Sequence, residues 1–72
     1  MDEYFINRNL FSENLKKIRK EKGLTREELA DKINMSWESI KNYEMNRREP
    51  KISECATLAK ALGCTMSDLT GI

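Results

Sequence analysis

The run SWESIKNYEMN, which begins at Ser36, gathers side chains that are suited to specific contacts. Its first residues carry a hydroxyl, an indole and a carboxylate on Ser36, Trp37 and Glu38, and Lys41 and Asn42 follow shortly after. These groups donate or accept hydrogen bonds, or present a flat apolar surface, although a tryptophan is more often substantially buried than exposed. The residue types alone leave three interpretations open: a core helix, a protein-binding face and a reader of nucleic acid.

A basic segment, NRREP, follows this run and contains Arg47 and Arg48, with Lys51 just beyond it. The whole chain has a net charge of only +1, from 13 basic and 12 acidic residues, whereas nucleic-acid binders often carry a large basic excess. The excess is local, in the first predicted helix and around these three residues. A basic patch therefore remains possible on a nearly neutral chain.

Few residues suit catalysis or metal binding. The chain has no His, no CxxC pair, no glycine-rich phosphate loop and no recognisable pair of catalytic carboxylates, and 72 residues leave little volume for a pocket. We therefore expect no enzyme activity, no metal, no cofactor and no small-molecule ligand. Cys55 and Cys64 are expected to be free and buried as small hydrophobic residues, although their spacing also permits a disulfide.

Length and composition indicate one small folded domain. Hydrophobic residues make up 39% of the chain and charged residues 35%, which suits a soluble, helix-rich protein. No apolar run approaches the roughly 20 residues of a membrane span, and the N-terminus does not resemble a signal peptide. We expect a cytoplasmic protein with no membrane association.

Apolar residues at helical spacing predict an all-α fold, a compact bundle of about five short helices. The inward-facing residues expected in the first two helices are Leu10, Phe11, Leu15 and Ile18, then Leu29, Ala30 and Ile33. Those expected in the third and fourth are Ile40 and Tyr43, then Ile52, Cys55, Ala56, Leu58, Ala59 and Leu62, and Leu69 lies in a short fifth helix.

Residues with known end preferences mark the helix boundaries. Helix starts are expected after Thr25, Ser36 and Thr65, and helix ends at Gly23, Asn34, Asn46 and Gly63, because Asn and Gly accept a left-handed conformation. Helix two then covers about residues 26–33 and helix three about 37–45. Two short helices joined by about three residues cross steeply, as in a helix-turn-helix, and the second protrudes at its N-terminal end.

The ordered set KGLT, EELA, SxxSIKxYE, RxP and LAKALG resembles the Cro/cI-type (Xre-family, lambda-repressor-like) helix-turn-helix domain over about residues 15–69. The resemblance implies a five-helix fold whose third helix enters the DNA major groove. It also implies a bacterial or phage transcription regulator, acting as a repressor and as a homodimer on palindromic double-stranded DNA, with half-sites one helical turn apart.

Positions of the family with known roles match residues of this chain. The base-reading positions are Trp37, Glu38, Lys41 and Asn42. The positions that contact the DNA backbone are Arg26, Ser36, Arg47, Arg48 and Lys51. Arg19 and Glu44 match a buried structural ion pair of some relatives. Arg26 stands where Gln is usual, and Met45-Asn46 replaces a common Asn-Gly, which puts a backbone contact at Met45 in doubt.

Several of these roles have a simpler alternative. Trp37 either lies exposed at the DNA face or packs against helix two, and Glu38 either accepts a hydrogen bond from cytosine or only favours the helix dipole. Asn42 either binds an adenine edge or is plainly solvent-exposed. The low net charge and the Trp37–Glu38 pair also leave a protein-interaction module, such as an antitoxin-like partner with the same fold, as the alternative function.

The expected organisation is an N-terminal extension over residues 1–9 and a single helix-turn-helix domain over 10–72. Two regions compete as the dimer contact. One is the run Tyr4 to Ile6, and the other comprises Met66, Leu69 and Ile72.

Overall fold

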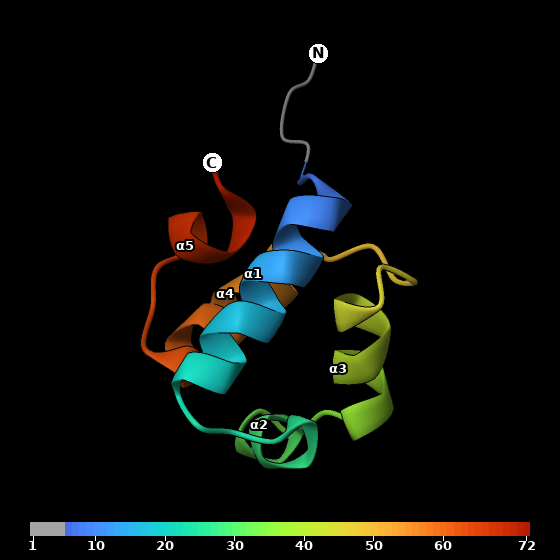
Figure 1. Cartoon of the computed structure of the whole chain (residues 1–72), viewed down its shortest axis with the longest axis vertical. Coiled ribbons are helices and arrows are strands. Elements are labelled where there is room, and N and C mark those ends of the chain that lie inside the picture. Colours follow the sequence, from blue (N-terminus) through green and yellow to red (C-terminus); the bar gives the residue numbers. More distant parts are fainter. Residues whose placement is uncertain (1–5) are drawn as a thin grey trace.

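The computed structural model describes residues 6–72, which form five α-helices and, over that range, no strand (Figure 1). The helices are α1 Arg8–Glu21, α2 Arg26–Lys32, α3 Trp37–Glu44, α4 Ile52–Leu62 and α5 Met66–Thr70. The all-α prediction is thus confirmed. Tyr4 and Phe5, considered above as a dimer contact, lie outside the described residues.

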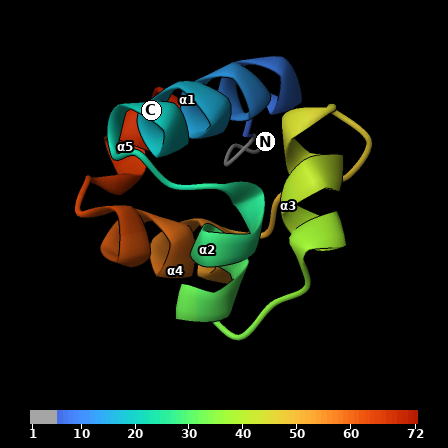
Figure 2. The same ribbon diagram turned by 60° about the horizontal axis from the view of Figure 1, so that its bottom comes forward.

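The helices enclose one core. In Figure 1, α1 crosses the molecule diagonally with α4 behind it, α5 packs at one side of both, and α3 lies on the other side. The view in Figure 2 brings α2 forward, beside α3 and near α4. The short α2 therefore holds α3 at the edge of the bundle, where one of its faces is uncovered.

The core contains most of the residues that the helical spacing predicted. Its buried members are Phe11, Leu15, Leu29, Ala30, Ile40, Tyr43, Cys55, Leu58, Ala59, Leu62 and Leu69. Three predictions were wrong, since Leu10, Ile52 and Ala56 are exposed. Leu10 and Ile52 lie in the first turn of their helices, so only the turns that follow are covered. Ile18 and Ile33 are partly buried against the core.

Capping side chains bound the helices as the sequence indicated. Thr25 and Glu28 form a reciprocal capping box, as do Thr65 and Asp68, whose pKa is lowered chiefly by the Thr65 backbone amide. Asn7 caps α1, so the first helix begins two residues before the expected domain boundary at residue 10. These local hydrogen bonds satisfy backbone amides that a helix start leaves without partners.

The two cysteines are free thiols, Cys55 buried and Cys64 half-buried. Burial raises the pKa of Cys55 to about 11. Among residues 6–72, no helix combines the length and the apolar character that crossing a membrane requires.

Candidate nucleic-acid interface

The turn between α2 and α3 sets the direction of α3. Asn34 adopts the left-handed conformation with φ 56°, and the amide of Met35 returns to the carbonyl of Ala30 at 3.0 Å. Ser36 then caps α3, its hydroxyl accepting from the Ser39 amide at 3.2 Å. The chain changes direction within the four residues between α2 and α3, and the first residues of α3 are exposed.

One face of α3 is fixed in the core and the other is open. Ile40 and Tyr43 are fully buried, and the Tyr43 ring meets Phe11 edge-to-face at a centroid distance of 5.5 Å. Ser36, Trp37 and Glu38 are exposed at the start of the helix. An aromatic pair of this geometry contributes roughly 0.5–1.5 kcal/mol beyond burial, so the helix is held firmly from behind.

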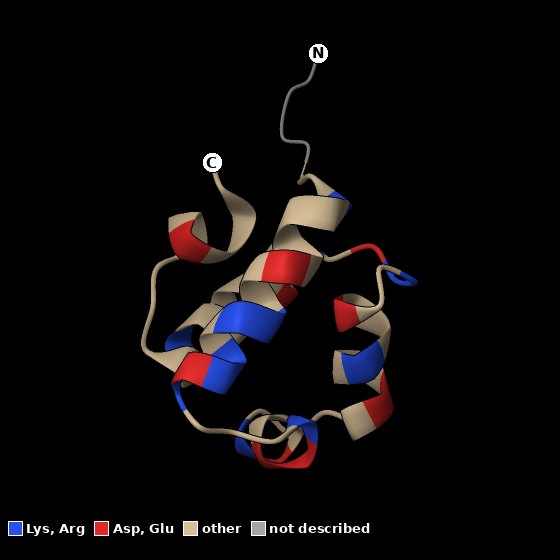
Figure 3. Cartoon of the chain, in the orientation of Figure 1, with Lys and Arg blue, Asp and Glu red and all other residues tan. Residues whose placement is uncertain are grey.

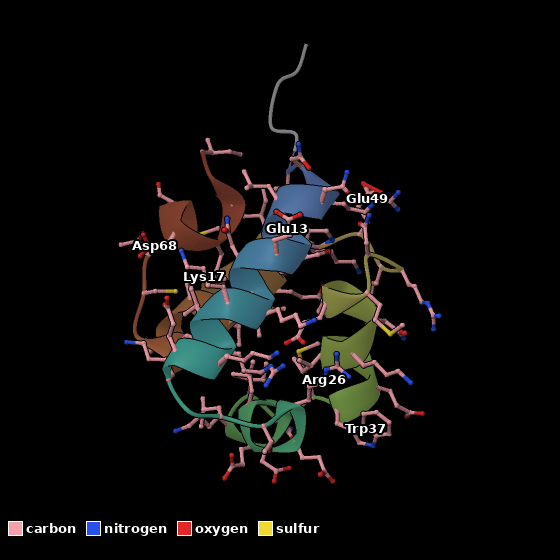
Figure 4. The ribbon with its side chains drawn as sticks, viewed as in Figure 1. Glu13, Lys17, Arg26, Trp37, Glu49 and Asp68 are labelled. Atoms are coloured by element: carbon pink, nitrogen blue, oxygen red, sulfur yellow. The ribbon has the colours of Figure 1, made fainter. Side chains whose placement is uncertain are left out.

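Trp37 lies at the exposed end of α3. Its residue surface is 43% exposed, and its ring borders a shallow cleft shared with Thr25, Arg26 and Glu27 of the neighbouring helix start. The ammonium of Lys41 lies over the ring, 5.6 Å from its centre. Figure 4 shows the indole at the end of α3, pointing outward. Trp37 is therefore exposed and also borders the start of α2, while its contact with DNA stays a prediction.

Two arginines share the buried carboxylate of Glu44 in α3. The Glu44 side chain is fully buried and accepts from Arg19 Nε at 2.5 Å and Nη2 at 2.9 Å. Arg19 Nη1 also donates to the Leu24 carbonyl at 2.7 Å. The hydrogen bonds that Arg19 donates to Glu44 raise the pKa of Arg19, against the lowering effect of burial. The pair expected between helices one and three is present in the structure.

Arg26 joins the same carboxylate, a contact that the sequence did not indicate. Its Nε donates to Glu44 Oε1 at 3.1 Å, with 32% of the side chain exposed. Glu44 thus links α1, α2 and α3 through two guanidinium groups. Arg26 was expected at the DNA backbone. Its Nε is held by Glu44, and the residue lines the cleft beside Trp37.

Arg48 is bound at both terminal nitrogens. Nη1 donates to Ser39 Oγ at 3.0 Å and Nη2 to Glu54 Oε2 at 3.0 Å. The guanidinium carbon lies 5.0 Å from the centre of the Tyr43 ring. The Tyr43 hydroxyl donates to the other oxygen of Glu54, and burial followed by this carboxylate raises the pKa of Tyr43. Ser39 belongs to the SxxSIKxYE motif, but nothing in the sequence indicated that Ser39 or Glu54 would bind Arg48.

The remaining predicted contacts lie on the surface around α3. Arg47 and Lys51 are exposed, and over residues 6–72 neither side chain has a hydrogen-bond or ion-pair partner. Lys41 and Asn42 are half-buried on α3. Figure 3 shows basic positions on α3 and on the loop after it, with acidic positions between them. Within the described part of the chain, no three His, Cys, Asp or Glu residues are grouped to hold a metal ion.

Two steeply joined short helices, the second exposed at its start and followed by a basic loop, define a helix-turn-helix domain. The chain belongs to the HTH_3 helix-turn-helix family, whose model matches residues 15–69. The predicted resemblance is confirmed, and the match includes α2, α3 and the loop that carries Arg47 and Arg48.

Two relatives of known sequence are named as a transcriptional regulator and an immunity repressor. The chain is 37% identical over 60 residues to the uncharacterized HTH-type transcriptional regulator YqaE of Bacillus subtilis, covering 83% of this chain and 52% of that protein. It is 39% identical over 57 residues to the immunity repressor protein of Bacillus phage phi105, covering 79% and 40%. The chain therefore spans about half or less of the length of these two relatives.

A solved structure gives the same fold. The restriction-modification controller protein C.AhdI from Aeromonas hydrophila superposes with a TM-score of 0.82 at 26% identity, over 86% of this chain and 94% of that one. The family is one of helix-turn-helix transcriptional regulators and repressors, and the two relatives are named as a regulator and a repressor.

Proposed function

We propose that the chain is a sequence-specific DNA-binding repressor that inserts α3 into the major groove of a palindromic operator as a homodimer. The observation that carries the proposal is the exposed first turn of α3, whose opposite face is fixed by Ile40 and Tyr43 in the core. A helix that is rigid behind and polar in front suits the major groove, which is wide enough to admit an α-helix.

Each side chain of the open face has a complementary base edge. The carboxylate of Glu38 accepts from the amino group of cytosine, and the amide of Asn42 pairs with adenine through two hydrogen bonds. The ring of Trp37 contacts a thymine methyl group, and Lys41 donates to guanine or to a phosphate. The 5.6 Å contact between Lys41 and Trp37 supports a joint role, because the ring limits where the ammonium lies.

Phosphate contacts surround this reading face. Ser36 lies at the start of α3, where the helix dipole favours an anion, and Arg26 borders the cleft beside Trp37. Arg47 and Lys51 add two exposed positive charges on the loop after α3. These groups contact DNA without regard to sequence, so they set affinity and its salt dependence rather than base preference.

The homodimer follows from the palindrome, since a two-fold site binds a two-fold protein. An apolar groove lined by Ile6, Ile52, Met66 and Ile72 is the proposed contact surface. Ile52 and Ile72 are 53% and 65% exposed, so burying them would be favourable. Leu69, proposed from the sequence for this contact, is fully buried in the core and is withdrawn.

Selection from a random DNA pool tests the proposal. We expect the enriched sequences to be palindromic with half-sites one helical turn apart, and binding to weaken steeply as salt rises. Asn42→Ala should cost about 1–3 kcal/mol and relax the preference at one base pair, whereas Arg47→Ala should weaken all sequences alike and lower the salt slope by about 1. If no DNA is enriched while a protein partner binds independently of salt, the interaction-module alternative is correct.

A further inference from the structure

We propose that Arg48 is a positioning residue, which locks the loop after α3 to the reading helix and to α4 and does not contact the DNA backbone. The inference rests on the DNA-binding function proposed above. Residue type and position in the family pattern assigned both Arg47 and Arg48 to the DNA backbone. Arg47 keeps that role, whereas Arg48 acts within the protein. The geometry around the guanidinium group carries the distinction.

Both terminal nitrogens and one flat face of the Arg48 guanidinium have partners within the protein, although 38% of the side chain is exposed. A phosphate is gripped by two parallel N–H groups, and here Nη1 donates to Ser39 and Nη2 to Glu54, each at 3.0 Å. One flat face lies on the Tyr43 ring at 5.0 Å. The carboxylate of Glu54 also neutralises the charge that would attract DNA.

The partners of Arg48 are themselves fixed. The second oxygen of Glu54 accepts from the hydroxyl of Tyr43, whose ring is fully buried. Ser39 Oγ lies 3.0 Å from Ser36 Oγ, the residue that caps α3. A continuous hydrogen-bonded path therefore runs from the start of α4 through Arg48 to the first turn of α3.

Arg47 differs in each respect. Its side chain is exposed, and the partners found for Arg48 have no counterpart at Arg47 among residues 6–72. Only its backbone is fixed, by an amide that donates to the Asn42 carbonyl at 2.8 Å. When Arg48 holds the loop, Arg47 projects from a defined backbone position. Arg48 thus aligns the loop, and Arg47 binds phosphate.

The carboxylate of Glu54 gives a test that depends on sign. If Arg48 bound a phosphate, Glu54 would compete with DNA for it, and removing the carboxylate charge would tighten binding. If Arg48 positions the loop, the same change releases it and weakens binding. Glu54→Gln is therefore the decisive variant. Glu49→Gln is its matched control, because it removes an equal charge from an exposed residue of the same loop.

The experiment measures the Kd of each variant for the enriched operator over a series of salt concentrations, at a temperature where circular dichroism shows it folded. We expect Glu54→Gln to weaken binding about threefold to tenfold, which corresponds to about 0.6–1.4 kcal/mol. Glu49→Gln should leave binding unchanged or tighten it slightly. Arg48→Ala should weaken binding with an unchanged salt slope, and the Arg48→Ala/Glu54→Gln double variant should be no weaker than Arg48→Ala alone.

Arg48→Lys keeps the test decisive if Arg48→Ala or Glu54→Gln does not fold. Lysine preserves the charge but cannot bridge Ser39 and Glu54 while lying flat on Tyr43, so a positioning role predicts a loss of binding with the salt slope retained. Near-normal binding by Arg48→Lys, or tighter binding by Glu54→Gln with a lower slope in Arg48→Ala, would overturn the inference. Failure of the wild-type chain to bind any DNA would instead overturn the proposed function.

Discussion

Replacing Glu44 with Gln should destabilise the fold far more than the same change on the surface. The substitution keeps the size of the side chain and one acceptor oxygen but removes the charge that Arg19 and Arg26 share. Arg19 is only 9% exposed at its side chain, so its charge would stay buried without a counterion. Arg19 would then donate only to the Leu24 carbonyl and to the one oxygen that Gln retains.

The size of the effect follows from the burial of the pair. Removing one partner of a buried ion pair costs about 3–5 kcal/mol, and the oxygen that Gln retains reduces this to about 2–4 kcal/mol. A domain of 72 residues has a total stability of roughly 4–11 kcal/mol, so the loss is a large fraction. The midpoint of thermal unfolding should fall by roughly 10–25 °C.

Urea unfolding followed by circular dichroism at the helix band measures this difference. Trp37 is a weaker reporter, since it is already 43% exposed in the folded chain. Glu13→Gln on the exposed face of α1 is the matched control, and its effect should stay within about 0.5 kcal/mol. Arg19→Met should cost nearly as much as Glu44→Gln, whereas Arg26→Met should cost about 0.5–1 kcal/mol, because Arg26 makes one bond and is 32% exposed.

Equal stabilities of Glu44→Gln and Glu13→Gln would refute the reasoning. That result would mean that the hydrogen bonds around Glu44 merely replace equivalent bonds to water, and that the core alone holds α1, α2 and α3 together. If Arg26→Met lowered the free energy of unfolding as much as Arg19→Met, the expectation that the Arg19 contact stabilises the fold more than the Arg26 contact would be wrong.

Two further predictions concern the backbone and pH. Asn34→Gly should raise the free energy of unfolding by up to about 0.5 kcal/mol, because φ is 56° there and glycine adopts it without strain. Asn42→Gly inside α3 should lower it by about 0.3 kcal/mol, the difference between the helix propensities of Asn and Gly, and urea titrations of both variants check the opposite signs. Burial, and next Glu54, raise the pKa of Cys55 from 9.0 to about 11, so the folded chain keeps this thiol neutral. The contribution of this thiol to the free energy of unfolding should therefore be constant below pH 9 and fall between about pH 9 and 11. Urea titrations at successive pH values measure this fall, and Cys55→Ala should remove the share that Cys55 contributes to it.

Helix ends were predictable because their causes are local. The capping boxes at Thr25 and Thr65 and the left-handed Asn34 and Asn46 each depend on a few neighbouring residues, and all four appear in the structure. Core positions were predictable where a helix is covered along its length. The spacing failed at Leu10 and Ile52, because periodicity gives the direction of a side chain and not the point where the covering helices end.

The sequence by itself determined the five helices and the tight turn before α3, since these follow from local hydrogen bonding and from the helical period. The resemblance had implied the Arg19–Glu44 pair, but only the tertiary structure decided the partners of Arg26 and Arg48. Arg26 reaches Glu44 across 18 residues of chain, and Arg48 reaches both Ser39 and Glu54. Basic residues that are alike in sequence differ here because an ion pair depends on which carboxylate the packing of separate helices brings within about 3 Å, and no pattern along the chain records that distance.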